Sequence, residues 1–196
     1  CFNGFNFIQY KKWMLIPFQK TLQKKVTFQG VGLHSGLKTE VSVLPATENH
    51  GIIFKRTDLN KNNTIKANFE NVSSAILCTT LKNKFEVKVT TVEHLLAALY
   101  ITGIDNALIE VSNSEIPIMD GSSKEFVETI AKVGIKNLNT KRKYLKIVKK
   151  FELKENEKVI SIEPDNNSLK VNFQLVYSNK VIGSQKNSIN FADTDL

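Results

Sequence analysis

The sequence predicts an α+β fold, and three observations favour this class. Short stretches alternate apolar and polar residues, as TEVSVLP does at 39–45, which is typical of a half-buried strand. Two other stretches, near 92–99 and 126–130, instead repeat apolar residues at helical spacing. The chain has 196 residues, of which 41% are hydrophobic and 23% are charged. This composition is that of a globular chain long enough to bury a core.

Several strands are expected in the first part of the chain. A strand over 22–28 leads into GVGLHSG at 30–36, where three glycines permit a tight turn or a close backbone approach to a ligand. The polar, Asn-rich stretch 57–71 is expected to be a loop. The other predicted strands lie at 39–45, 51–56 and 107–111, and a β-hairpin joins 76–81 to 85–89 with residues 82–84 near its tip.

The first predicted helix covers TTVEHLLAALYITG at 90–103. Thr90 and Glu93 fit a capping box, in which the two side chains satisfy backbone N–H groups of the first turn. Gly103 stands where a helix end favours a left-handed residue. One face is apolar at helical spacing and should be buried, namely Val92, Leu95, Leu96 and Leu99.

The second predicted helix follows a turn at Asp120-Gly121. Ser122 and Glu125 give it a second capping-box pattern, and Gly134 marks its end. Asp120 is interpreted as a turn or capping residue that supports this helix. Its buried face is expected to consist of Phe126, Val127 and Ile130.

The chain is expected to contain an N-terminal extension (1–20), a first α+β domain (21–140) and the beginning of a second one (141–196). The polar stretch 137–143 is predicted to be the linker. Strand patterns follow at 144–153, 158–164, 169–177 and 187–191, with no helix to cover the second sheet. We therefore expect a C-terminal truncation, and Met14 is a candidate true start.

Composition restricts the classes of function. Two cysteines, Cys1 and Cys78, cannot form a disulfide framework, so a reducing, cytoplasmic compartment is expected. No apolar run approaches the ~20 residues of a transmembrane helix. The net charge of +8 is spread along the chain without a nucleic-acid-binding motif. A solvated surface is the first interpretation of this charge, and an anionic membrane face or a phosphorylated substrate would also suit it.

The adjacent pair Glu93–His94 leaves two interpretations open at the level of local spacing. Glu93 is a helix cap and His94 a solvated flank in the first. In the second, His94 is a metal ligand and Glu93 a base that acts on metal-bound water. The pair alone is a weak motif and does not decide between them.

Four stretches in this order and spacing change that balance: GVGLHSG (30–36), LCTTL (77–81), TVEHLLAAL (91–99) and EIPIMDGS (115–122). Together they resemble the UDP-3-O-acyl-N-acetylglucosamine deacetylases, zinc amidases that commit bacteria to lipid A synthesis. The resemblance covers roughly residues 20–196. It implies two similar α+β domains with helices sandwiched between two sheets, the second incomplete here, and an active site at the domain junction.

The resemblance also implies roles for individual residues. Glu93 would be the catalytic general base and His94 a ligand of Zn²⁺, which lowers the pKa of bound water toward ~7. His34 and Leu33 would line the substrate, although an exposed loop histidine is the plain alternative. Leu77 and Cys78 would lie near the metal cleft, although a lone cysteine is more often a small buried hydrophobe. His50 matches no family position and is expected in a surface turn.

The family takes its other two zinc ligands from an HKxxD-type helix of the second domain, and no such stretch occurs in this sequence. A catalytic zinc usually has three protein ligands, so the chain alone is expected to be inactive. The alternative function is a non-catalytic remnant that binds a partner or the acyl sugar weakly. The expected partner is the UDP-linked acyl glucosamine, with a monomeric chain, peripheral contact with the inner membrane and no nucleic acid.

Overall fold

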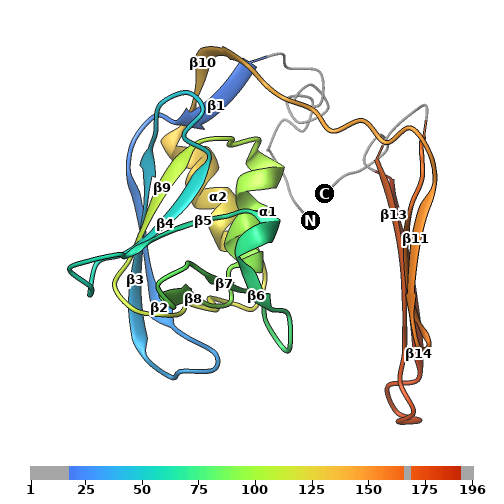
Figure 1. The fold of residues 1–196 in the computed structure, drawn as a ribbon. Coiled ribbons are helices and arrows are strands. Elements are labelled where there is room, and N and C mark those ends of the chain that lie inside the picture. Colours follow the sequence, from blue (N-terminus) through green and yellow to red (C-terminus); the bar gives the residue numbers. More distant parts are fainter. Residues whose placement is uncertain (1–17, 166–168, 191–196) are drawn as a thin grey trace. The chain divides into compact units, whose positions relative to one another are not determined.

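The computed structural model describes residues 18–165 and 169–190. These residues fall into two compact units, 18–142 and 143–190 without 166–168, and each is treated by itself (Figure 1). Met14 and the chain end from residue 191 lie outside the described residues. Among the described residues, no helix is long and apolar enough to cross a membrane.

A five-stranded sheet forms the framework of the first unit, with the order β2-β3-β9-β4-β5. All neighbouring strands are antiparallel except β4 and β9, which are parallel. The strands are β2 (Val26–Val31), β3 (Lys38–Pro45), β4 (Ile52–Arg56), β5 (Thr64–Lys66) and β9 (Ala107–Val111). The predicted strands at 39–45, 51–56 and 107–111 are therefore confirmed to within one residue at each end.

Alternation along the strands places one face of this sheet in the core. In β9, residues 107, 109 and 111 are buried while their neighbours are half-exposed. The register sets Val43 opposite Ile109 and Val41 opposite Val111, so the apolar side chains of adjacent strands share a face. These residues belong to one core cluster with the buried residues of the two helices.

Both helices lie on the same side of this sheet (Figure 1). Helix α1 (Glu93–Thr102) buries Leu95, Ala98 and Leu99, and helix α2 (Lys124–Val133) buries Phe126 and Ile130. The ring of Phe126 meets that of Phe28 of β2 edge-to-face, with centroids 4.8 Å apart. The predicted apolar faces are confirmed, with Leu96 and Val127 partly buried against the same core.

Neither predicted capping box forms. The residues before the helices, Val92 and Ser123, have helical φ and ψ and make no side-chain capping bond. The Glu93 carboxylate accepts a hydrogen bond from the backbone N–H of Thr79 instead. The predicted C-terminal glycines are confirmed, since Gly103 and Gly134 both have positive φ, 73° and 86°.

Two smaller sheets complete the first unit. Strand β1 (Phe18–Leu22) pairs antiparallel with β10 (Ile135–Lys141). The short strands β6 (Val72–Ser74), β7 (Thr80–Lys82) and β8 (Lys88–Val89) form the other. The hairpin expected from 76–81 and 85–89 is present only as β7 and β8, and residues 76–79 are not a strand.

Three expectations for this unit were wrong. A bend at 23–24 divides the predicted strand 22–28 between β1 and β2. Most of the predicted linker 137–143 belongs to β10, because pairing with β1 satisfies its backbone groups despite its polar side chains. The predicted loop 57–71 contains β5 and a 3₁₀ helix at Phe69–Asn71, which Asn68 caps through its side chain.

The second unit consists of two antiparallel hairpins in its described part. One pairs β11 (Phe151–Glu155) with β12 (Lys158–Ile162), and the other pairs β13 (Lys170–Val176) with β14 (Ser184–Asn190). Residues 144–150 are not a strand, so the predicted strand 144–153 is shorter than expected. Many apolar side chains of the hairpins are exposed, including Leu153, Ile160, Phe173 and Val176.

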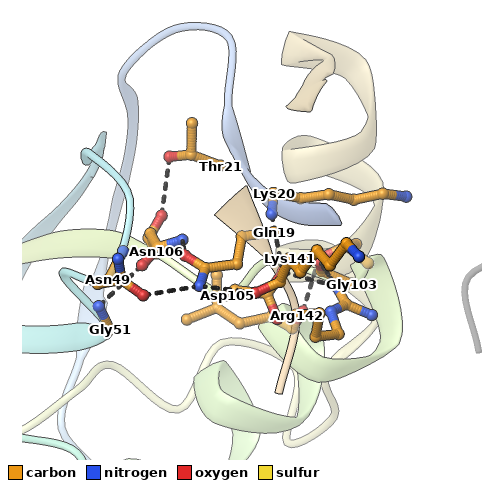
Figure 2. Close-up of polar contacts among 12 residues, drawn as sticks. Gln19, Lys20, Thr21, Asn49, Gly51, Gly103, Asp105, Asn106, Lys141 and Arg142 are labelled. Atoms are coloured by element: carbon orange, nitrogen blue, oxygen red, sulfur yellow. Dashed lines mark hydrogen bonds and ion pairs between the residues drawn. The ribbon is translucent and has the colours of Figure 1, made fainter. Parts of the chain in front are cut away.

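A polar network joins β1 and β10 to the loop between α1 and β9 (Figure 2). The Asp105 carboxylate accepts hydrogen bonds from the Lys20 backbone N–H and from Nη2 of Arg142, both at 2.7 Å. The same Nη2 donates to the carbonyl oxygen of Gly103 at 2.6 Å. This places a cation at the C-terminal end of α1, where the helix dipole favours positive charge.

The amide side chains of Gln19 and Asn106 extend this network. Asn106 Nδ2 donates to Gln19 Oε1 at 2.9 Å, and the Gly51 backbone N–H donates to Asn106 Oδ1 at 2.9 Å. The Thr21 hydroxyl donates to the Asn106 carbonyl oxygen at 2.8 Å. The central residues of β1 are therefore bonded to the two residues that directly precede β9.

We expect Asp105→Asn to destabilise the chain, because the largely buried Arg142 side chain loses its carboxylate. Hydrogen bonds to charged groups contribute about 1.5–3 kcal/mol each, so a loss of that size in the free energy of unfolding is expected. Urea unfolding followed by circular dichroism measures it. The control is Glu86→Gln, which removes the more exposed pair of Glu86 with Lys82. A loss no larger than that of the control would contradict this role of Asp105.

Candidate active site

The loop between β2 and β3 carries the predicted substrate residues Leu33 and His34. Its turn is closed by two backbone hydrogen bonds, from Gly32 N–H to the Leu37 carbonyl and from Gly36 N–H to the Gly32 carbonyl, both at 3.0 Å. Gly36 has a φ of 67°, which glycine adopts without strain. The side chains of Leu33 and His34 are both exposed on this loop, and Leu33 is 61% exposed.

A buried carboxylate, Glu115, lies against the same loop. Its Oε1 accepts the His34 backbone N–H at 2.9 Å, and its Oε2 accepts the Ser35 backbone N–H at 2.7 Å. Oε1 also accepts the Thr91 hydroxyl at 2.9 Å. Glu115 is 1% exposed, so this carboxylate is solvated by protein donors in place of water.

Hydrogen bonding decides the ionisation of Glu115. Burial alone raises the pKa of this carboxyl, but hydrogen bonds from Ser35, His34 and Thr91 outweigh that effect and hold the pKa below its usual range. The carboxylate is therefore charged near neutral pH. The sequence stretch EIPIMDGS contains this residue, but only the spatial contacts reveal it, since its donors lie 24 to 81 positions away.

The predicted base and metal ligand, Glu93 and His94, lie at the start of α1, and both side chains are half-buried. Oε2 of Glu93 accepts the Thr79 backbone N–H at 3.0 Å. The hydroxyl of Ser123, just before α2, donates to the His94 carbonyl oxygen at 2.9 Å. The first turn of α1 is thus held by contacts from other segments of the unit.

The predicted residues Leu77 and Cys78 directly precede Thr79. Leu77 has a φ of 65° and is 88% exposed, an uncommon conformation for a residue other than glycine. The Cys78 thiol is half-buried, with its sulfur 3.9 Å from the Thr80 hydroxyl oxygen. Because Thr79 bonds to Glu93, the structure brings this segment to the start of α1.

Two other positions lie apart from these contacts. Asp120 accepts the backbone N–H and the hydroxyl of Ser122 at 2.9 and 2.8 Å, and these bonds lower its pKa. This agrees with its interpretation as a turn residue. His50 lies beside the turn at 48–49, where its Nδ1 is 3.0 Å from the Gly51 carbonyl oxygen.

The donor chemistry fits a metal only in part. His94 supplies an imidazole, a common zinc ligand, next to a carboxylate that can act as a base. Within the described ranges, no group of three or more His, Cys, Asp or Glu side chains is arranged to hold a metal ion.

Comparison with known proteins gives one consistent family. Residues 19–196 match the family described as UDP-3-O-acyl N-acetylglycosamine deacetylase. The chain is 45% identical over 164 residues to a protein of Colwellia psychrerythraea strain 34H, covering 84% of this chain and 53% of the relative. It is 42% identical over 173 residues to one of Aliivibrio fischeri strain ES114, covering 88% and 56%.

A third relative, from Shewanella sp. strain ANA-3, is 41% identical over 172 residues, covering 88% of this chain and 56% of its own length. All three relatives are named UDP-3-O-acyl-N-acetylglucosamine deacetylase. The chain spans about half the length of the curated relatives it matches.

The ionised Glu115 predicts a pH-dependent stability. Because its folded-state pKa is lowered, its contribution is complete above the unfolded value of about 4.3 and is lost as pH falls through the folded value. At pH 7, Glu115→Gln should cost roughly 1–3 kcal/mol, the penalty for buried donors left unsatisfied. This difference should shrink toward pH 3.

Urea unfolding of the wild type and the variant at several pH values measures this difference. The control is Glu110→Gln, on β9, whose carboxylate pairs with the half-buried Lys55. The control should change stability by less than about 1 kcal/mol at any pH. A cost of Glu115→Gln that stays constant between pH 7 and pH 3 would show that its charge does not stabilise the fold.

Proposed function

Because the chain belongs to the UDP-3-O-acyl N-acetylglycosamine deacetylase family, we propose that the protein containing it hydrolyses the N-acetyl amide of UDP-3-O-acyl-N-acetylglucosamine. The products would be acetate and the free amine, in the committed step of lipid A synthesis. The observation that carries the proposal is the family match over 19–196, which includes the adjacent Glu93 and His94. A cytoplasmic location is part of the proposal.

Glu93 is the proposed general base. Its carboxylate is half-buried, so it is accessible to water while the surrounding protein restrains it. The Thr79 N–H bonds to Oε2, while Oε1 has no protein hydrogen bond among the described residues. Oε1 can therefore accept the proton of an attacking water and return it to the amine leaving group.

His94 is the proposed ligand of Zn²⁺. When bound, zinc supplies Lewis-acid activation of water and of the amide carbonyl. His94 precedes the buried face of α1, and its backbone carbonyl is held by Ser123, so the imidazole extends from a fixed helical turn. We propose that the remaining zinc ligands belong to parts of the protein outside the described residues, since a catalytic zinc usually has three protein ligands.

The exposed side chains near this turn are the proposed substrate contacts. Leu33 and Leu77 are 61% and 88% exposed, which costs hydrophobic free energy in the free protein and suits contact with an acyl chain or a sugar face. His34 would donate a hydrogen bond to the substrate from the same loop. Cys78 would contribute a small, half-buried wall beside Leu77.

Substitution of Glu93 and His94 tests these roles in the protein expressed from its complete reading frame. Glu93→Gln keeps the size of the side chain but cannot accept the proton, so turnover should fall ~10²–10⁴-fold with zinc content unchanged. His94→Ala should lose both zinc and activity, because a metal ligand is removed. Acetate release and bound zinc are measured for each variant.

The matched control is Glu125→Gln, since Glu125 is an exposed glutamate in the first turn of the other helix. Its turnover should equal that of the wild type. Near-normal turnover of Glu93→Gln would return Glu93 to a structural role, whereas loss of zinc in Glu93→Gln would make it a ligand instead of a base.

The 196-residue chain by itself should bind zinc weakly and should not turn over the substrate, because one imidazole cannot form the ligand set that gives tight affinity. Equilibrium dialysis against a weak chelator, followed by metal analysis, measures the retained zinc. Stoichiometric zinc in the dialysed chain would contradict the proposed division of ligands. Substrate binding without turnover would favour the alternative function, a non-catalytic acyl-sugar-binding remnant.

A further inference from the structure

We propose that Glu115 is a positioning residue of the candidate active site, where its carboxylate holds the His34 loop against the segment that begins α1. The inference rests on the proposed function, because it concerns the alignment of His34 with Glu93 and His94. It adds a residue that does not itself touch the reacting atoms.

The two oxygens of Glu115 connect two separate segments. Oε1 accepts both the His34 backbone N–H and the Thr91 hydroxyl, each at 2.9 Å, and Oε2 accepts the Ser35 backbone N–H at 2.7 Å. One atom therefore bonds simultaneously to the substrate loop and to the residue two positions before Glu93. Moving either segment breaks a bond to a buried, charged acceptor, which is among the stronger hydrogen bonds in proteins.

The backbone at Thr91 requires such a restraint. Thr91 is buried and has a φ of 57°, and a β-branched residue in this region is strained. Such conformations persist where the surroundings impose them. The neighbouring Thr90 bonds through its backbone to Ser114 and Ile116, on either side of Glu115. These backbone bonds and the Thr91 hydroxyl therefore hold the same two segments together.

The loop is also shaped to admit this carboxylate. A Cβ added at Gly32 would collide with Oε2 of Glu115 and with the Ser35 hydroxyl oxygen, and would lie 2.8 Å from the carboxyl carbon of Glu115. Only glycine leaves this space. Gly32→Ala is therefore a second, independent way to displace the carboxylate without changing its chemistry.

Thr91, which Glu115 restrains, lies only two residues before the proposed base Glu93. From Thr91, the chain passes Val92, which is fully buried and whose N–H bonds to the Thr79 carbonyl oxygen, and then enters α1 at Glu93. Glu93 itself accepts the Thr79 N–H. A misplacement of about 1 Å in such a site lowers the rate by about 10²-fold.

The experiment measures kcat and KM of the protein expressed from its complete reading frame with four variants, Glu115→Gln, Gly32→Ala, Thr91→Val and Thr91→Ser. Glu115→Gln should lower kcat/KM by about 10²-fold. Only the oxygen of the Gln amide accepts hydrogen bonds, whereas both oxygens of the carboxylate do. Gly32→Ala should behave similarly. Thr91→Val removes one bond and should have a smaller effect, whereas Thr91→Ser keeps the hydroxyl and should retain nearly full activity.

Two readouts separate positioning from a general loss of structure. The acid limb of the pH profile of kcat/KM should keep its midpoint in Glu115→Gln, because a positioning residue does not itself transfer the proton. Amide hydrogen exchange should accelerate at His34 and Ser35 but not in the centre of β3 and β9. If Glu115→Gln does not fold, the contrast between Thr91→Val and Thr91→Ser decides the question.

Wild-type kcat/KM in Glu115→Gln, combined with faster exchange at His34 and Ser35, would overturn the inference. The hydrogen bonds of Glu115 would then be broken without a loss of activity. Equal activities of Thr91→Val and Thr91→Ser would also overturn it. A shifted acid limb would assign Glu115 to proton transfer instead. An inactive wild-type protein that folds and binds zinc would refute the proposed function itself, and this inference would fall with it.

Discussion

The burial of β9 between β3 and β4 is the constraint on which the first unit depends. Its alternating residues 107, 109 and 111 fill the core, so its ends are fixed relative to both helices. Just before it, Asp105 and Asn106 bond to β1, and Asp105 also bonds to Arg142, directly after β10. Beyond its end, the chain reaches Glu115, which holds the His34 loop and Thr91. One buried strand thereby sets the positions of a structural network and of the candidate site.

Features that depend on near neighbours in the sequence were predictable. The period of two in β3 and β9, the apolar faces of both helices and the glycines at 103 and 134 follow from local patterning and conformational preference. The first capping box failed because a distant donor, the Thr79 N–H, binds Glu93. The second failed because the Ser122 backbone N–H bonds to Asp120 instead of Glu125. Strand β10 was missed because its polar side chains hide a backbone pairing with β1, more than 110 positions away.

In the candidate site, too, local features were predictable and long-range contacts were not. The motif that holds Glu93 and His94 was visible in the sequence, together with the exposed residues Leu33, His34 and Leu77. The contacts of Glu115 and Thr79 were not visible, because their hydrogen-bond partners lie 14 to 81 positions away. Opposing effects also decide the charge of Glu115, since burial and hydrogen bonding act on its pKa in opposite directions. The direction of this pKa shift therefore depends on three-dimensional contacts that the sequence does not show.

The central claim is that Glu93 and His94 serve zinc-dependent amide hydrolysis. Its most direct measurement is the release of free ¹³C-acetate from UDP-3-O-acyl-N-acetylglucosamine labelled in the acetyl group, followed by NMR. The protein expressed from its complete reading frame is assayed as purified, after removal of metal by a chelator, and after zinc is returned. If Glu93 and His94 have the proposed roles, acetate release stops on chelation and recovers with zinc. Acetate release that is indifferent to chelation, or absent from a folded protein loaded with zinc, would contradict it.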